Sequence, residues 1–144
     1  MRIEIDQSGK IESYINTIIA FRNGEQFSVL LDRKTKNEII TNYRGKYKDI
    51  IYRLFAICIF YCIKTYLDKT QKIIIDIEYK GREKDIKKHL LRFIWRVKPN
   101  FNKDIIQFDI IGKKSRAHRL AYQTFIGKLA PNRILTKKEV EELL

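Results

Sequence analysis

Residues 72–81 read KIIIDIEYKG, and this stretch decides the fold. Three consecutive isoleucines predict a strand that is buried on at least one face. Side chains alternate along a strand, so three isoleucines share one face and the acids share the other. Acids near the end of a central strand, just before Gly81, indicate one side of a site; a strand that leaves the core with solvated last residues is the alternative. The first face carries Ile73, Ile75 and Ile77, and the second carries Ile74, Asp76 and Glu78.

The composition predicts one globular domain that meets a polyanion. The chain has 144 residues, of which 44% are hydrophobic, enough for a sizeable core. Its formal net charge is +13, an excess typical of proteins that meet nucleic acid or an acidic membrane surface. Plain solubility and ion pairing are the alternatives. We predict nucleic acid as the partner, whether RNA, DNA or a hybrid.

The two cysteines and the apolar runs indicate an intracellular protein with no membrane partner. Residues 1–6 predict a strand and lack the features of a signal peptide. The longest uncharged apolar run, residues 54–63, is too short to cross a bilayer. Cys58 and Cys62 lie one helical turn apart and suit neither zinc binding nor a disulfide. We expect both to be buried in a protein of the reducing cytoplasm.

The first third of the chain predicts an antiparallel meander. Three segments show strand patterns, at residues 2–6, 17–22 and 26–32. Asn23-Gly24, between the second and third, is a strong hairpin signal because the favoured turn needs positive φ at both central residues. Residues 33–45 are mixed in character and are interpreted as a connection.

The rest of the chain alternates helices with strands, which favours parallel strands added beside the meander. The helix near residues 46–67 carries an apolar stripe so wide that it must be nearly surrounded. We predict a mixed five-stranded sheet with helices on both faces, formed by residues 1–130. A helical extension, residues 131–144, packs on the same domain. The other expected elements are a strand at 72–79, a helix at 81–98, a strand at 104–111, a helix at 115–128 and a final helix from Thr136.

Three short motifs fall in this order of elements. They are DQSG at residues 6–9, DIEY at 76–79 and AHRLA at 117–121. Together with the element order, they resemble the ribonuclease H-like superfamily over residues 1–130. The family has an Asp followed by small residues in its first strand, Asp-Ser-x-Tyr after its fourth, and Ala-Asp-x-Leu-Ala in its last helix. His118 stands here where the family usually has the last Asp.

The resemblance implies a site for two divalent cations, Mg²⁺ or Mn²⁺, and hydrolysis of phosphodiester bonds. Hard cations prefer oxygen ligands, and two ions about 3.5–4 Å apart can activate water and stabilise the leaving oxygen. By the resemblance, Asp6 bridges the ions, Asp76 completes the shared site and His118 takes the fourth ligand position. These three are the expected catalytic residues. A histidine ligand favours Mn²⁺ more than an all-carboxylate site does.

One departure from the family pattern bears on activity. The family's buried helix normally offers a Glu in Glu-Leu-x-Ala, whereas this chain has RLFA at residues 53–56 and so places Arg53 there. Asp49, Glu4 and Glu78 are the substitutes we consider, with Glu78 expected among the metal ligands. Without that ligand a two-metal site is incomplete. The alternative is therefore a non-catalytic nucleic-acid-binding protein, in which Arg53 holds a phosphate.

Two basic stretches are expected to bind the nucleic-acid backbone with little sequence preference. One is a face of the helix at 81–98, where His89 is interpreted as solvated; the other is the start of the last helix. Both are expected at the end of the sheet that carries Asp6 and Asp76. The predicted contacts are Arg53, Lys88, Arg92, Trp95, Arg96, Lys113, Lys114, Arg116 and Arg119.

Overall fold

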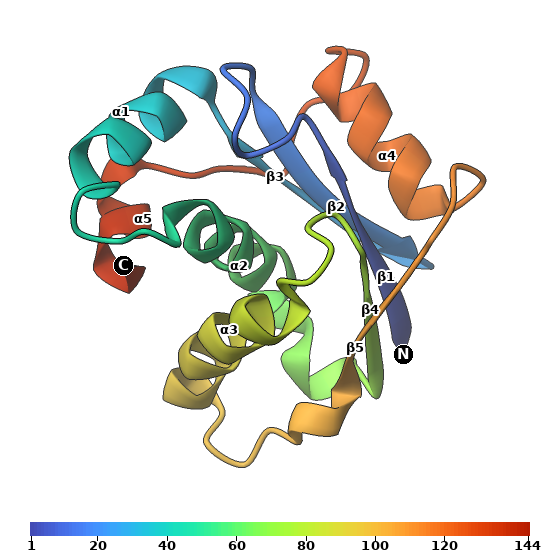
Figure 1. Ribbon diagram of the computed structural model, residues 1–144. Coiled ribbons are helices and arrows are strands. Elements are labelled where there is room, and N and C mark those ends of the chain that lie inside the picture. Colours follow the sequence, from blue (N-terminus) through green and yellow to red (C-terminus); the bar gives the residue numbers. More distant parts are fainter.

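The computed structural model describes residues 1–144 and has an α/β fold built on a mixed sheet (Figure 1). The strand order is β5-β4-β1-β2-β3-β6. The first three strands form the expected antiparallel meander, and β4 and β5 follow parallel to β1. The strands are β1 (Arg2–Ser8), β2 (Thr17–Asn23), β3 (Glu25–Leu31), β4 (Lys72–Asp76), β5 (Ile106–Asp109) and β6 (Arg133–Ile134).

The sheet has six strands, so the prediction of five is wrong. The additional strand, β6, lies within the C-terminal segment and pairs in parallel with β3 at Val29 and Leu30. It has only two residues, and a strand that short has no alternating pattern to detect. The chain after it forms a helix that contacts α1 and α2, and its first turn carries the expected capping box at Thr136.

Helices cover both faces of the sheet (Figure 1). α2 and α3 pack on one face, and α4 packs on the other face against β1 and β2. Two separate apolar clusters follow from this arrangement, the larger one around α2 and the smaller one under α4. The helices are α1 (Arg33–Tyr43), α2 (Ile50–Ile63), α3 (Glu83–Val97), α4 (Arg116–Phe125) and α5 (Lys137–Leu143), with short 3₁₀ turns η1 (Lys64–Lys69) and η2 (Lys103–Ile105).

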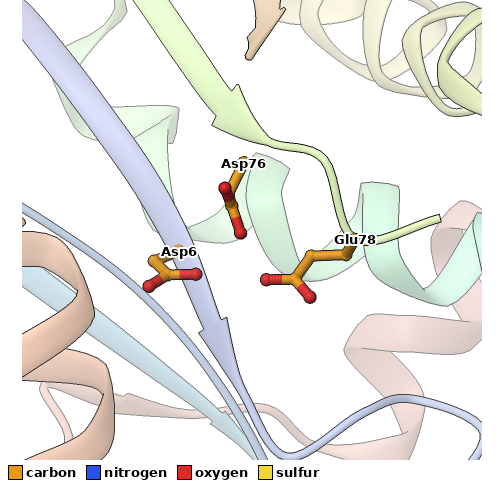
Figure 2. A group of neighbouring side chains, drawn as sticks. All are labelled: Asp6, Asp76 and Glu78. Carbon is orange, nitrogen blue, oxygen red and sulfur yellow. The ribbon is translucent and has the colours of Figure 1, made fainter. Parts of the chain in front are cut away.

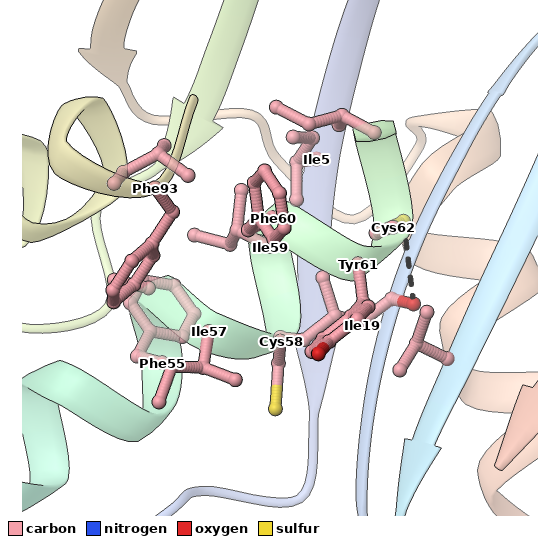
Figure 3. Packing of buried hydrophobic residues seen from close by; sticks show 14 of the residues in the cluster. Ile5, Ile19, Phe55, Ile57, Cys58, Ile59, Phe60, Tyr61, Cys62 and Phe93 are labelled. Carbon is pink, nitrogen blue, oxygen red and sulfur yellow. Dashed lines mark hydrogen bonds between the residues drawn. The ribbon is translucent and has the colours of Figure 1, made fainter. Parts of the chain in front are cut away.

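The α2 helix is the centre of the core, as its wide apolar stripe predicted. Eleven of its fourteen residues are buried. Figure 3 shows their side chains between the strands and Phe93 of α3, with the Cys62 thiol 3.7 Å from the carbonyl oxygen of Ile19. Both cysteines are buried and unpaired, which confirms that expectation. The stretch Ile50–Lys69 is apolar and long enough for a membrane span, but 67% of its most apolar window is buried inside the fold, as in a core helix.

The interpretation of residues 33–45 as a connection is wrong, because α1 occupies most of them. Asp32 caps this helix by accepting a hydrogen bond from the Thr35 N–H at 2.9 Å. The helical pattern is hidden in the sequence because Lys36 takes a fully buried position that an apolar residue normally fills. Its ammonium group donates to the carbonyl oxygens of Lys10 and Ile15 and to the Thr17 hydroxyl.

The expected hairpin forms, but with a different turn. Asn23 pairs with Glu25 across Gly24, and only Gly24 has a positive φ, at 71°. The Asn23 side chain donates to the carbonyl oxygen of Arg2. This contact keeps Asn23 within β2 instead of at the first central position of a two-residue turn.

Candidate metal centre

The register of two parallel strands brings Asp6 and Asp76 together. Ile5 of β1 pairs with Ile75 of β4, so the next residue on each strand is an aspartate, and both point to the face that α4 covers. One carboxylate oxygen from each of Asp6, Asp76 and Glu78 lies within 4.8 Å of the other two (Figure 2). We call these three residues the carboxylate cluster. The expected proximity of the two aspartates is confirmed, and Glu78 joins them.

Glu78 reaches the cluster because the chain leaves the sheet at the end of β4. The Ile77 N–H donates to the carbonyl oxygen of Asp109 at 3.1 Å, which is the last backbone contact with β5. Glu78 then turns back so that its carboxylate points toward the two aspartates (Figure 2). The strand-face argument therefore places it correctly, although the strand itself ends two residues earlier.

Hydrogen bonds fix the orientation of both aspartates. The Gln7 N–H donates to Oδ1 of Asp6 at 2.8 Å, and Nδ1 of His118 lies 2.8 Å from Oδ2 of the same carboxylate. The Ile111 N–H donates to Oδ1 of Asp76, also at 2.8 Å. His118 therefore contacts the cluster through Asp6, from the first turns of α4, whose start Ser115 caps. Such contacts set the direction of a carboxylate before any cation binds.

Burial and mutual repulsion shift the protonation of the cluster. Asp6 is only 5% exposed, and this burial raises the pKa of its carboxyl group, against the opposing effect of its hydrogen bonds. Burial, together with the two neighbouring carboxylates, raises the pKa of Glu78 to about 9. The free cluster therefore keeps a proton at neutral pH. A divalent cation would compensate the same repulsion, and three hard oxygen donors suit such an ion, so the cluster could hold a metal ion.

Tyr79 supports the cluster and was missed in the sequence analysis. Its hydroxyl accepts a hydrogen bond from the Ile11 N–H at 3.1 Å and donates to the Gln7 side chain at 3.3 Å. Its ring packs edge-on against Tyr52 and Phe55 of α2. Tyr79 thus ties the segment after β4 to the segment after β1, and so holds the chain on either side of the carboxylates. The tyrosine of the DIEY motif was the available signal.

Of the candidates for the missing helix acid only Glu78 joins the cluster, whereas Arg53 and Asp49 lie outside it. Arg53 binds Asp49, with Nε 2.8 Å from Oδ1, and its guanidinium lies 4.0 Å from the centre of the Tyr47 ring. The other oxygen of Asp49 lies 2.7 Å from Nε2 of His89. Asp49 is therefore fully engaged and supplies no ligand. The interpretation of His89 as solvated is wrong: it is 5% exposed, because it faces α2 and pairs with Asp49 there.

The prediction that both basic stretches lie at the Asp6 and Asp76 end of the sheet is wrong for the last turns of α3. α3 connects two parallel strands, so it starts at the cluster end of the sheet and runs back toward the opposite end (Figure 1). Trp95 and Arg96 therefore lie far along the helix, and the Trp95 N–H donates to the carbonyl oxygen of Phe101 at 3.0 Å. The other predicted contacts on α3 are Lys88 and Arg92. Around the start of α4, the exposed predicted contacts are Lys113, Lys114 and Arg119. Arg116 lines a separate pocket.

Comparisons of this chain with protein-family models, with curated proteins and with solved structures gave no match. The interpretation of the site therefore rests on its own geometry and chemistry.

Proposed function

We propose that this chain is a metal-dependent nuclease of the ribonuclease H-like superfamily, which hydrolyses phosphodiester bonds in nucleic acid. Its substrate would be an RNA–DNA hybrid or another nucleic acid. The observation that carries the proposal is the carboxylate cluster, in which one oxygen from each residue lies within 4.8 Å of the others at the ends of two parallel strands. The net charge of +13 on the same chain supports a polyanionic substrate.

The placement of the three motifs supports the family assignment. The DQSG motif supplies Asp6, the DIEY motif supplies Asp76 and Glu78, and the AHRLA motif supplies His118. These motifs lie far apart in the sequence, yet all four side chains gather at one end of the sheet. The meander followed by strands parallel to the first is also what the resemblance implies.

The proposed chemistry uses Mg²⁺ or Mn²⁺ held by Asp6, Asp76 and Glu78. The bound ion would supply Lewis acidity and lower the pKa of a coordinated water. The protein's own contribution is orientation: the Gln7 and Ile111 N–H groups hold one oxygen of each aspartate and leave the carboxylates directed at one another. His118 lies against Asp6 and helps to hold that carboxylate in position.

A second candidate function is non-catalytic binding of nucleic acid. The observation that favours it is the pairing of Arg53 with Asp49, which leaves α2 without a carboxylate for the cluster. Three carboxylates can hold one divalent cation together with water, but a two-cation site needs more carboxylate ligands. In this case the fold would keep its basic surfaces and bind its partner without cleaving it.

A cleavage panel distinguishes the two functions. Labelled single-stranded, duplex, hybrid and branched substrates are incubated with Mg²⁺ and then with Mn²⁺, using the wild type, Asp76→Asn and the control Asp104→Asn. Asp104 is exposed and lies outside the cluster. We expect Asp76→Asn to lower the cleavage rate more than about 100-fold, since even partners of metal ligands are worth 10–100-fold. Binding in EDTA should stay within about twofold.

Two results would contradict the nuclease proposal. If the wild type binds nucleic acid but cleaves no substrate with either ion, non-catalytic binding is the function. If Asp76→Asn cleaves as fast as Asp104→Asn, the activity does not reside in the carboxylate cluster.

A further inference from the structure

A second polar site lies on the same face of the sheet as the carboxylate cluster. It is a pocket of about 450 Å³ whose lining contains no hydrophobic residue. We call it the arginine pocket. Its lining residues are Arg2, Glu4, Arg22, Asn23 and Arg116.

Three elements build the arginine pocket. Arg2 and Glu4 share with Asp6 one face of β1, because side chains at every second residue point the same way. The register that pairs Ile5 with Phe21 brings Arg22 of β2 beside Glu4. Arg116 is the first residue of α4, and the preceding residue, Ser115, places its hydroxyl 3.4 Å from the carboxylate of Glu4.

The charges of the arginine pocket are not balanced within the protein. Three arginines face one glutamate, and that glutamate lies 3.6 Å from Arg2. Neither Arg22 nor Arg116 lies within 4.0 Å of any carboxylate. Two unpaired guanidinium groups that converge on one space repel each other, and an anion between them removes that repulsion. Their planar forks match the oxygens of a phosphate group.

We propose that the arginine pocket binds a phosphate group of the nucleic-acid backbone, next to the carboxylate cluster. The identity of the polymer rests on the proposed function. Glu4 and Asp6 are two residues apart on β1, or about 6.6 Å at 3.3 Å per residue. The pocket is therefore close enough to the carboxylate cluster for one strand to contact both, and the bound strand follows β1.

Binding in EDTA tests this assignment without cleavage. A fluorescein-labelled single-stranded 12-mer is titrated into the wild type, the double variant Arg22→Gln/Arg116→Gln and the control Arg33→Gln/Arg44→Gln. The control removes the same charge from exposed arginines at the two ends of α1, neither of them ion-paired. We expect at least about tenfold weaker binding for the pocket variant. Its slope of log K against log salt concentration should also fall by about 0.7, the value for one phosphate contact on a single strand.

The affinity of the control for the 12-mer should fall by less than about twofold. If it falls as much as that of the pocket variant, the effect is due to net charge alone and the proposal is overturned. Inorganic phosphate, followed through the arginine Nε–H signals in NMR spectra, separates the free ion from the polymer. Shifts of Arg22 and Arg116 with phosphate, combined with unchanged 12-mer binding by the pocket variant, would overturn the assignment to nucleic acid.

The failure of this proposal differs from the failure of the nuclease proposal. If the wild type cleaves nucleic acid and the pocket variant binds as well as the control, only the proposal for the arginine pocket is refuted. If the wild type cleaves nothing but the pocket variant binds more weakly, the nuclease proposal is refuted. The arginine pocket is then part of a binding surface.

Discussion

Replacing Glu78 with Gln should stabilise the metal-free protein and at the same time remove its response to metal. The raised pKa of Glu78 means that the folded protein keeps a proton that the unfolded chain releases above its ordinary pKa of 4.5. The free energy of unfolding of the wild type therefore falls as the pH rises from 4.5 toward about 9. Gln resembles the protonated acid in shape and in its ability to donate a hydrogen bond, so the variant lacks this slope.

The size of the effect follows from the pKa. Between 4.5 and pH 7 the folded and unfolded states differ by one proton over 2.5 pH units, at about 1.4 kcal/mol per unit. This gives an upper bound of about 3.5 kcal/mol at pH 7. Because Glu78 is only partly buried, water screens part of the repulsion, and we expect about 1–3 kcal/mol. The melting temperature would then rise by roughly 3–10 °C at pH 7.

Urea denaturation in EDTA at pH 4.5, 7 and 8.5 measures this, with Glu142→Gln as the control for the same chemical change at an exposed position. The gain from Glu78→Gln should be near zero at pH 4.5 and grow with pH. The same samples are then melted with Mn²⁺, which should stabilise the wild type and the control but not the variant. A pH-independent loss of stability in Glu78→Gln, or an unchanged Mn²⁺ response, would refute the account of the cluster.

Three further results are expected. Mn²⁺ at 100 times its dissociation constant should raise the free energy of unfolding of the wild type by about 2.7 kcal/mol in thermal melts and leave Asp76→Asn unchanged. Lys36→Ala should cost at least about 3 kcal/mol in urea denaturation, because it creates a cavity and leaves three buried or half-buried oxygens without their donor. Gly9→Ala should cost more than Gly127→Ala by about 2 kcal/mol or more: both glycines have positive φ, but a Cβ at Gly9 meets the backbone oxygen of Asn16 and one at Gly127 meets open space.

The meeting of Asp6 and Asp76 could be predicted because strand periodicity alone nearly fixes it. The buried isoleucines of β1 and β4 must face the same core, and each aspartate follows its last isoleucine by one residue. Once the strands pair in parallel, the aspartates share the opposite face. The one remaining unknown was the register of β1 against β4. The position at which the apolar residues end in each strand indicated it.

The contacts between distant elements could not be predicted in this way. The pairing of Asp49 with His89 depends on how α2 and α3 cross, and neither residue departs from the usual pattern of its helix. α1 was missed because Lys36 is buried through three oxygen acceptors that come from other parts of the chain. The arginine pocket combines Arg2 of β1 and Arg22 of the adjacent β2 with Arg116, and only the docking of α4 brings Arg116 there.

The pairing of Arg53 with Asp49 has a direct consequence for Glu78. Because α2 directs Asp49 toward α3, the third oxygen donor of the cluster comes from the segment after β4 instead. Burial and the two neighbouring aspartates raise the pKa of Glu78 to about 9, and a bound cation would relieve the repulsion among the three carboxylates. The repulsion among the carboxylates therefore contributes both to the stability lost in the free protein and to the affinity for metal. A variant that separates them, gaining stability without losing metal binding, would place the cation elsewhere.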